Sequence, residues 1–258
     1  MRLVSSFVWV LLATTLFILL SPIIVPLTVA FSEREVISFP PTGFTLKWFY
    51  NAFKFKSLVD GFKLSLYIGF AASSIAMALS LPASYALFKY SFKGKSIIEN
   101  IFLAPSLMPE IVLSYLLLIY LIAFARFPGS LALLLGHILI ITPYAMRYVY
   151  ASLVNLSKEI EEAAVSLGAH PVRAFLDVVV PNVKNGLVAG FITSFVVSFN
   201  AFSISLFLSY GAMPLPIAMW NYLQVRYDPT IAALSCMLIL FTVTLTIIAR
   251  RIVSLRGV

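Results

Sequence analysis

Apolar stretches separated by short charged segments run the whole length of the chain. Six of these stretches contain no charged residue, except that Glu110 interrupts the third, and they cover residues 3–32, 64–88, 100–125, 127–146, 185–225 and 229–249. A helix that crosses a lipid bilayer needs roughly 20 apolar residues. The pattern therefore predicts a chain made of membrane-spanning helices.

The fifth stretch is too long for a single crossing. Gly211, Pro214 and Pro216 divide it into a span and an exposed loop. The predicted spans are then 8–30, 64–88, 100–124, 130–150, 187–208 and 230–249, within a single transmembrane domain over residues 1–258. We expect an all-α polytopic membrane protein with six transmembrane helices and a cytoplasmic loop between the fourth and the fifth.

Composition supports the membrane interpretation. Hydrophobic residues make up 61% of the chain and charged residues 11%, whereas about a quarter of the residues in a soluble domain are charged. The net charge of +8 is scattered over the ends of the predicted spans. No compact basic stripe with interleaved aromatic residues occurs, so we expect no binding to nucleic acid.

Basic residues set the expected orientation, because short loops that carry Lys and Arg stay in the cytoplasm. The segments expected there hold Arg2, Lys89, Lys93, Lys95, Arg147, Lys158, Arg173, Lys184, Arg250, Arg251 and Arg256. The first external loop, residues 33–63, is the exception, with five basic residues. The N-terminal run exceeds the 7–15 residues or so of a signal-peptide core, so we interpret it as the first span. Both termini are expected in the cytoplasm of a prokaryotic cell, with the chain crossing its plasma or inner membrane.

Patterns of catalytic or metal-binding residues are absent from the sequence. His137 and His170 are the only histidines, Cys236 is the only cysteine, and no HExxH motif occurs. Gly94-Lys95-Ser96 resembles the end of a phosphate-binding loop, but Lys89 stands where that motif needs its first glycine. We expect no catalytic residue, no metal and no cofactor.

Residues 154–181 form a segment too charged to lie in lipid. Ser157 is a predicted helix N-cap, and Glu159, Glu161 and Glu162 follow in the first turns, where the helix dipole favours negative charge. Ala163-Ala164 then offers a small face that permits close approach of another backbone. An acidic helix of this kind is a poor match for the negative cytoplasmic leaflet, so docking onto a protein is favoured over resting on lipid.

A second helix is expected after a tight turn. Gly168 is the predicted C-cap, because glycine adopts positive φ without strain. Pro171 suits the first position of a helix over about 171–179, and Pro181 is expected to stop that helix before the fifth span.

The same residues resemble a known motif. Glu162-Ala163-Ala164, then Gly168, and Pro181 after Val178-Val179-Val180 resemble the EAA motif of permease subunits of binding-protein-dependent ABC importers. The family's motif usually ends in Ile-x-Leu-Pro, and this chain departs from it mildly with Val178-Val179-Val180-Pro181. Further segments are similar to PotC-type permeases of spermidine/putrescine importers, at residues 43–48, 90–95, 109–112 and 215–220.

This resemblance implies a transmembrane subunit that works with two ATPase subunits, a second permease and an external solute-binding protein. The second permease is a copy of this chain or a different chain, and similarity to polyamine systems implies a different chain. Glu162, Ala163, Ala164, Gly168 and Pro181 are then the residues expected to couple the chain to the ATPase. Closure of the ATPase would rock the spans between inward-facing and outward-facing states.

The expected solute pathway has fewer signals. Glu110 is a carboxylate inside an apolar stretch, and such groups usually face a cavity or a partner. PotC-like permeases often carry an acidic pair in the fifth span, where this chain has Ser198-Phe199-Asn200-Ala201. A polyamine and a neutral or anionic solute both stay open, with Asn200, Ser203 and Ser205 as further candidate lining residues.

Two other classes of protein remain as alternatives, a secondary transporter and a membrane assembly factor. A secondary transporter should show inverted repeats and ionisable residues near the middle of the bilayer. No clear repeat occurs, and Glu110 stands nearly alone.

Overall fold

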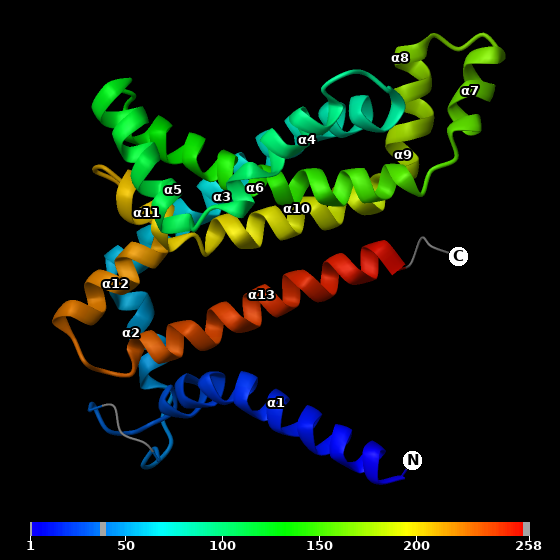
Figure 1. Ribbon diagram of the computed structural model, residues 1–258. Helices are drawn as coiled ribbons and strands as arrows, with labels where there is room; N and C mark the ends of the chain where they lie inside the picture. The colour runs from blue at the N-terminus through cyan, green and yellow to red at the C-terminus, as the bar shows by residue number, and fades with distance from the viewer. Residues whose placement is uncertain (1, 37–39, 255–258) are drawn as a thin grey trace. The chain divides into compact units, whose positions relative to one another are not determined.

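The computed structural model describes residues 2–36 and 40–254, and every regular element within these ranges is helical (Figure 1). The described chain divides into two compact units. The first contains the residues up to Val59 together with Ala218–Thr242, and the second contains Asp60–Ile217 together with the residues from Val243 onward. The all-α prediction is confirmed.

The first unit contains α1 (Arg2–Val29), α2 (Lys47–Lys54), most of α12 (Leu215–Val225) and the first half of α13 (Thr230–Ser254). Its small core surrounds Trp48, whose indole Nε1 donates a hydrogen bond of 2.7 Å to the carbonyl oxygen of Ser32. Residues 8–20 of α1 are apolar apart from two threonines, yet they are exposed. Such a surface is typical of a helix that faces lipid or another membrane helix.

The second unit begins within α3 (Lys56–Lys89) and is built around α6 (Gly129–Val154) and α10 (Lys184–Phe199). Small buried residues recur at every fourth position of α10, at Gly186, Gly190, Ser194 and Ser198. A Cβ atom on Gly186 would lie 2.8 Å from the backbone oxygen of Tyr148 in α6 and even closer to the side chain of Ser152. The two helices therefore pack by close backbone approach, as small-xxx-small helix pairs in membranes do.

Four described helices are individually long and apolar enough to cross a membrane: α1 from Val8, α3, α6 and α13. Two further candidate spans are helix pairs bent at a short break. One pair joins Lys95–Leu107 to Glu110–Phe124 at 103°, and the other joins Pro171–Asn182 to Lys184–Phe199 at 69°. Counting each pair as one span gives up to 6 spans, the number expected from the sequence. The second pair begins at Pro171, in the predicted cytoplasmic loop, and only its second helix overlaps the predicted fifth span.

The bend in the third predicted span lies at Met108 and Pro109. It separates α4 (Lys95–Leu103) and the 3-10 turn Ala104–Leu107 from α5 (Glu110–Leu117) and the π-helical turn Leu118–Phe124. Met108 has an extended backbone with ψ 144°, because a residue that precedes proline avoids the helical region. The sequence predicted one span over 100–124, and the sharp bend within it is a finding of the structure.

The fifth predicted span, 187–208, is likewise made of two helices. α10 ends at Phe199, Asn200 and Ala201 interrupt the helix, and α11 runs over Phe202–Leu208. Gly211 adopts φ +78°, so the expected turn after this span is present. The predicted exposed loop beyond it is partly helical, since α12 begins at Leu215.

Candidate coupling site

The charged segment between α6 and α10 folds as a helical hairpin of the second unit. Its first arm is α7 (Lys158–Ser166), and its second arm consists of α8 (Pro171–Ala174), the π-helical turn η3 (Phe175–Val179) and α9 (Val180–Asn182). Figure 1 shows α7 beside the second arm, at the end of the unit where α4 and α9 also lie. The two predicted helices and the turn between them are therefore present.

The turn of the hairpin is closed by Gly168, which adopts φ +96°. Its backbone N–H donates to the carbonyl oxygen of Val165 at 2.9 Å, and the N–H of Ala169 donates to that of Ala164 at 3.1 Å. These two bonds define a Schellman motif, which satisfies the last carbonyl groups of a helix and favours glycine at the left-handed position. The predicted C-cap role of Gly168 agrees with this geometry.

The second arm begins as the sequence predicted. Pro171 occupies its first turn, and the Nδ1 atom of His170 accepts a hydrogen bond of 3.3 Å from the backbone N–H of Val172. The end of the arm differs from the prediction, because the helix continues through Pro181 to Asn182. Proline lacks an N–H group to donate within a helix, and the π-helical turn η3 directly precedes the α9 turn that contains it. Pro181 therefore does not stop the helix, and the direction changes instead at Val183, before α10.

Glu161 fixes the first arm to the end of α3. The residue is only 7% exposed, and its Oε1 atom lies 2.5 Å from Nζ of Lys89. The hydroxyl group of Tyr85 also donates to Oε1 of Glu161, and Nζ of Lys89 donates to the Tyr85 hydroxyl oxygen at 2.7 Å. A buried carboxylate is tolerated only when it is paired and hydrogen-bonded, and both conditions hold here.

The second arm is fixed by apolar packing. Ala174, Val179 and Val183 are almost completely buried, and the latter two belong to the main core of the second unit. The ring of Phe175 lies 4.5 Å from the ring of Tyr85, centre to centre. Tyr85 thus contacts both arms, through its hydroxyl group and through its ring.

The opposite side of the hairpin is exposed and partly apolar. Glu162, Ala163 and Gly168 are exposed, and Ala164 is half-buried. Leu167 is 90% exposed, and four further apolar side chains are exposed with it: Ile160, Val165, Val172 and Leu176. Exposed apolar residues on a segment outside the lipid are typical of a surface that docks onto a partner protein.

The sequence pattern does not reveal the contact of Glu161 with Lys89 and Tyr85. It predicts only that Glu161, like its acidic neighbours, lies in the first turns of a helix. The contact joins residues 72 positions apart, and helical periodicity cannot reveal such a pairing. The available signal was two adjacent glutamates, Glu161 and Glu162, which a helix directs to different sides.

The four candidate pathway residues lie in different surroundings. Glu110 is exposed at the first position of α5, directly after the bend at Pro109. Asn200 is exposed where α10 ends, and its Nδ2 atom donates to the carbonyl oxygen of Val196 at 2.8 Å. Ser203 is half-buried, whereas Ser205 is 1% exposed and donates to the carbonyl oxygen of Ala201 at 2.7 Å. The hydroxyl group of Ser205 is thus used inside its own helix.

These features define an all-helical polytopic membrane protein with an exposed helical hairpin between α6 and α10. Residues 74–255 match the family described as "Binding-protein-dependent transport system inner membrane component". Because the match covers well over half of the chain, the protein belongs to this family of ABC importer permease subunits. Such subunits are not enzymes. A partner ATPase hydrolyses ATP, and a substrate-binding partner takes part in transport.

Several curated proteins are similar over most of their length. The spermidine/putrescine permease PotC of Haemophilus influenzae is 26% identical over 90% of both chains. The putrescine permease PotI of Escherichia coli is 25% identical over 86% of this chain and 81% of its own. The molybdate/tungstate permease WtpB of Methanocaldococcus jannaschii is 26% identical over 78% of this chain and 84% of its own.

Solved structures support the same fold. A bacterial ABC transporter that imports the acidic polysaccharide alginate contains a chain with a TM-score of 0.67 and 17% identity, covering 100% of this chain and 97% of that one. The inward-facing MetNI methionine transporter matches with a TM-score of 0.64 and 20% identity, over 76% of this chain and 94% of that one. Neither the relatives nor the structures support a secondary transporter or an assembly factor.

Proposed function

We propose that this chain forms a solute pathway with a second, different permease and receives the force of ATP hydrolysis through the hairpin 154–181. Two ATPase subunits at the cytoplasmic side and an external solute-binding protein complete the importer. Glu162, Ala163, Ala164 and Gly168 contribute to the surface that seats on the ATPase, and both termini lie in the cytoplasm.

The observation that carries this proposal is the two-sided construction of the hairpin. Glu161 is buried against Lys89 of α3, while Glu162 and Ala163, its immediate neighbours, are exposed. A segment that transmits movement from the ATPase to the spans needs one side fixed to the spans and another side free to bind the ATPase. The hairpin has both, because its inner side joins α3 and the core while its outer side carries exposed apolar residues.

Pro181 has a different place in this proposal. It lies in the last turn of the second arm, just before the bend of 69° that leads into α10. A proline there stiffens the connection between the hairpin and the fifth span, since its φ angle is fixed.

The solute class is proposed from the relatives. Two of the permeases named above serve polyamines, and one serves molybdate and tungstate. Glu110 and Asn200 are exposed at interruptions of predicted spans, where a pathway needs polar groups, and Ser203 lies near Asn200 on α11. We place these three in the pathway and leave the buried Ser205 outside it.

Copurification and uptake test the proposal together. The tagged chain, expressed with its genomic neighbours, should retain an ATPase and a second permease. Vesicles that contain this complex should take up a solute only with ATP and the binding protein. Competition by spermidine against uptake supports the polyamine class, and competition by molybdate supports the oxyanion class. Uptake driven by an ion gradient without ATP would contradict the proposal.

A further inference from the structure

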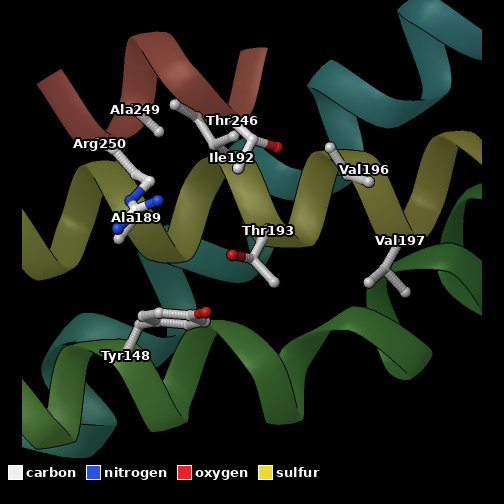
Figure 2. Close-up of a pocket in the computed structure, with 9 residues that line it drawn as sticks. All are labelled: Tyr148, Ala189, Ile192, Thr193, Val196, Val197, Thr246, Ala249 and Arg250. Atoms are coloured by element: carbon white, nitrogen blue, oxygen red, sulfur yellow. The ribbon is translucent and has the colours of Figure 1, made fainter. Parts of the chain in front are cut away.

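A cavity of about 520 Å³ lies in the second unit between α6, α10 and the last turns of α13 (Figure 2). Tyr148 comes from α6, five residues including Ala189 and Thr193 come from α10, and Thr246, Ala249 and Arg250 come from α13. The volume lies within the range of about 300–1,000 Å³ that is usual for small-molecule sites. Neither the coupling hairpin nor the candidate pathway residues contribute to its lining.

The lining changes character along α10. In Figure 2 the guanidinium group of Arg250 lies beside Ala189, and Tyr148 and Thr193 face the same part of the space, whereas Val196 and Val197 line the other end. With a rise of about 1.5 Å per residue, Val196 lies roughly 10 Å along the helix from Ala189. One end of the cavity is therefore polar and the other is apolar.

Arg250 is the only charged residue of the lining. Among the described residues it forms no ion pair, since the three pairs found there involve other side chains. A guanidinium group in such surroundings favours a planar or tetrahedral oxyanion that accepts two hydrogen bonds, and phosphate is the usual choice.

The phosphate could belong to a free ion or to a phospholipid headgroup, and the position of the cavity in the membrane distinguishes the two. Arg250 follows directly after the sixth predicted span, 230–249, and Ala189 lies near the start of the fifth, 187–208. The predicted orientation places both at the cytoplasmic leaflet, whose lipids are anionic. A free phosphate ion would use the polar end alone, whereas a phospholipid also fills the apolar end with an acyl chain.

We propose that this cavity binds an anionic phospholipid of the cytoplasmic leaflet, with its phosphate on Arg250 and one acyl chain along Val196 and Val197. Tyr148 and Thr193 offer hydroxyl groups to the headgroup. The lipid fills the space between α10 and the end of α13, and so links the hairpin-connected fifth span to the last span. A polyamine does not suit this cavity, because its charge would be repelled by Arg250 and no carboxylate lines the space.

Native mass spectrometry of the purified full-length chain tests the site. The protein is equilibrated in micelles that contain equal amounts of phosphatidylglycerol and phosphatidylcholine, and the retained lipid is counted. We expect roughly tenfold more phosphatidylglycerol than phosphatidylcholine on the unchanged protein. Arg250→Gln should remove most of this preference, and the neighbouring Arg251→Gln, which does not line the cavity, is the matched control and should keep it.

A second variant tests the site without depending on Arg250 and controls for loss of folding. Val196→Phe fills the apolar end and leaves every charge in place, so it should lower phosphatidylglycerol retention severalfold while the thermal midpoint stays close to that of the unchanged chain. Equal losses for Arg250→Gln and Arg251→Gln would show diffuse attraction and overturn the proposal. Arg250-dependent binding of inorganic phosphate with no selective lipid retention would assign the site to a free anion and also overturn it. The assay needs no ATPase, so its outcome is independent of the proposed coupling function.

Discussion

The contact between Glu161 and Lys89 makes the most specific prediction about coupling. Glu161→Gln keeps the size of the side chain and removes its charge, so Lys89 loses its carboxylate partner. Removing one member of a fully buried ion pair costs about 3–5 kcal/mol, whereas exposed pairs are worth about 0–1 kcal/mol. The side chain of Lys89 is 32% exposed and that of Glu161 is 9% exposed, so the pair lies between these limits, and we expect a cost of about 2 kcal/mol.

The loss of the ion pair destabilises the attachment of α7 to α3 by this amount. At about 1.4 kcal/mol for each factor of ten, 2 kcal/mol lowers the population of the attached hairpin by about thirtyfold relative to the detached one. The outer surface with Glu162 and Ala163 is unchanged, so the ATPase should still bind. ATP hydrolysis should then continue, but a smaller fraction of the hydrolysis events should move the spans.

The assay is the ratio of solute taken up to ATP hydrolysed, measured in vesicles that contain the whole transporter. Glu161→Gln should lower this ratio severalfold at an unchanged amount of assembled complex. Asp177→Asn is the matched control, because Asp177 belongs to an exposed ion pair with Arg173 at 3.6 Å, and it should change the ratio by less than about twofold. The charge swap Lys89→Glu with Glu161→Lys should restore part of the ratio. A Glu161→Gln transporter that couples as well as the Asp177→Asn transporter would refute the reasoning.

Three further substitutions test the local structure. Gly168→Val should leave the protein inserted but uncouple ATP hydrolysis from solute uptake, because a β-branched residue is strained at φ +96°. Asparagine tolerates this region, so Gly168→Asn should keep most activity. Equal uptake by both variants counts against the Schellman turn. Gly186→Val should lower the yield and thermal midpoint of folded protein, since its side chain would collide with the backbone of Tyr148. Ser166→Val, at an exposed position, is the control and should fold normally. His170→Ala removes the hydrogen bond of 3.3 Å that caps the second arm, so a protease that cleaves the hairpin should cut this variant faster than the unchanged protein. An equal rate would show that the cap is unimportant.

The sequence predicted the parts of the fold that depend on local chemistry. Five of the six long uncharged stretches correspond to α1, α3, α6, α13 and the helix pair bent at Pro109. Gly168 and Pro171 stand at the turn and at the start of the second arm. These features follow from neighbouring residues alone, since a helix end needs a left-handed residue and a helix start tolerates proline.

Features that depend on distant residues were not predicted. The sequence does not show which proline bends its span by 103°, because proline is tolerated in many continuous membrane helices, as Pro82 in α3 and Pro143 in α6 show. The prediction that Pro181 stops the helix was wrong for a related reason, since a π-helical turn directly before α9 lets the helix continue. The anchoring role of Glu161 required knowledge that α7 lies against the end of α3.

Cross-linking tests the central claim most directly. Because Cys236 is the only cysteine, a variant with Cys236→Ser and Ala163→Cys carries a single thiol on the exposed side of the hairpin. In membranes that contain the whole transporter, a short bifunctional reagent should join this thiol to the ATPase, and a reagent that cannot cross the membrane should reach it only from the cytoplasmic side. Labelling from the outside, or a purified transporter in which no ATPase is joined to residue 163, would contradict coupling through this hairpin.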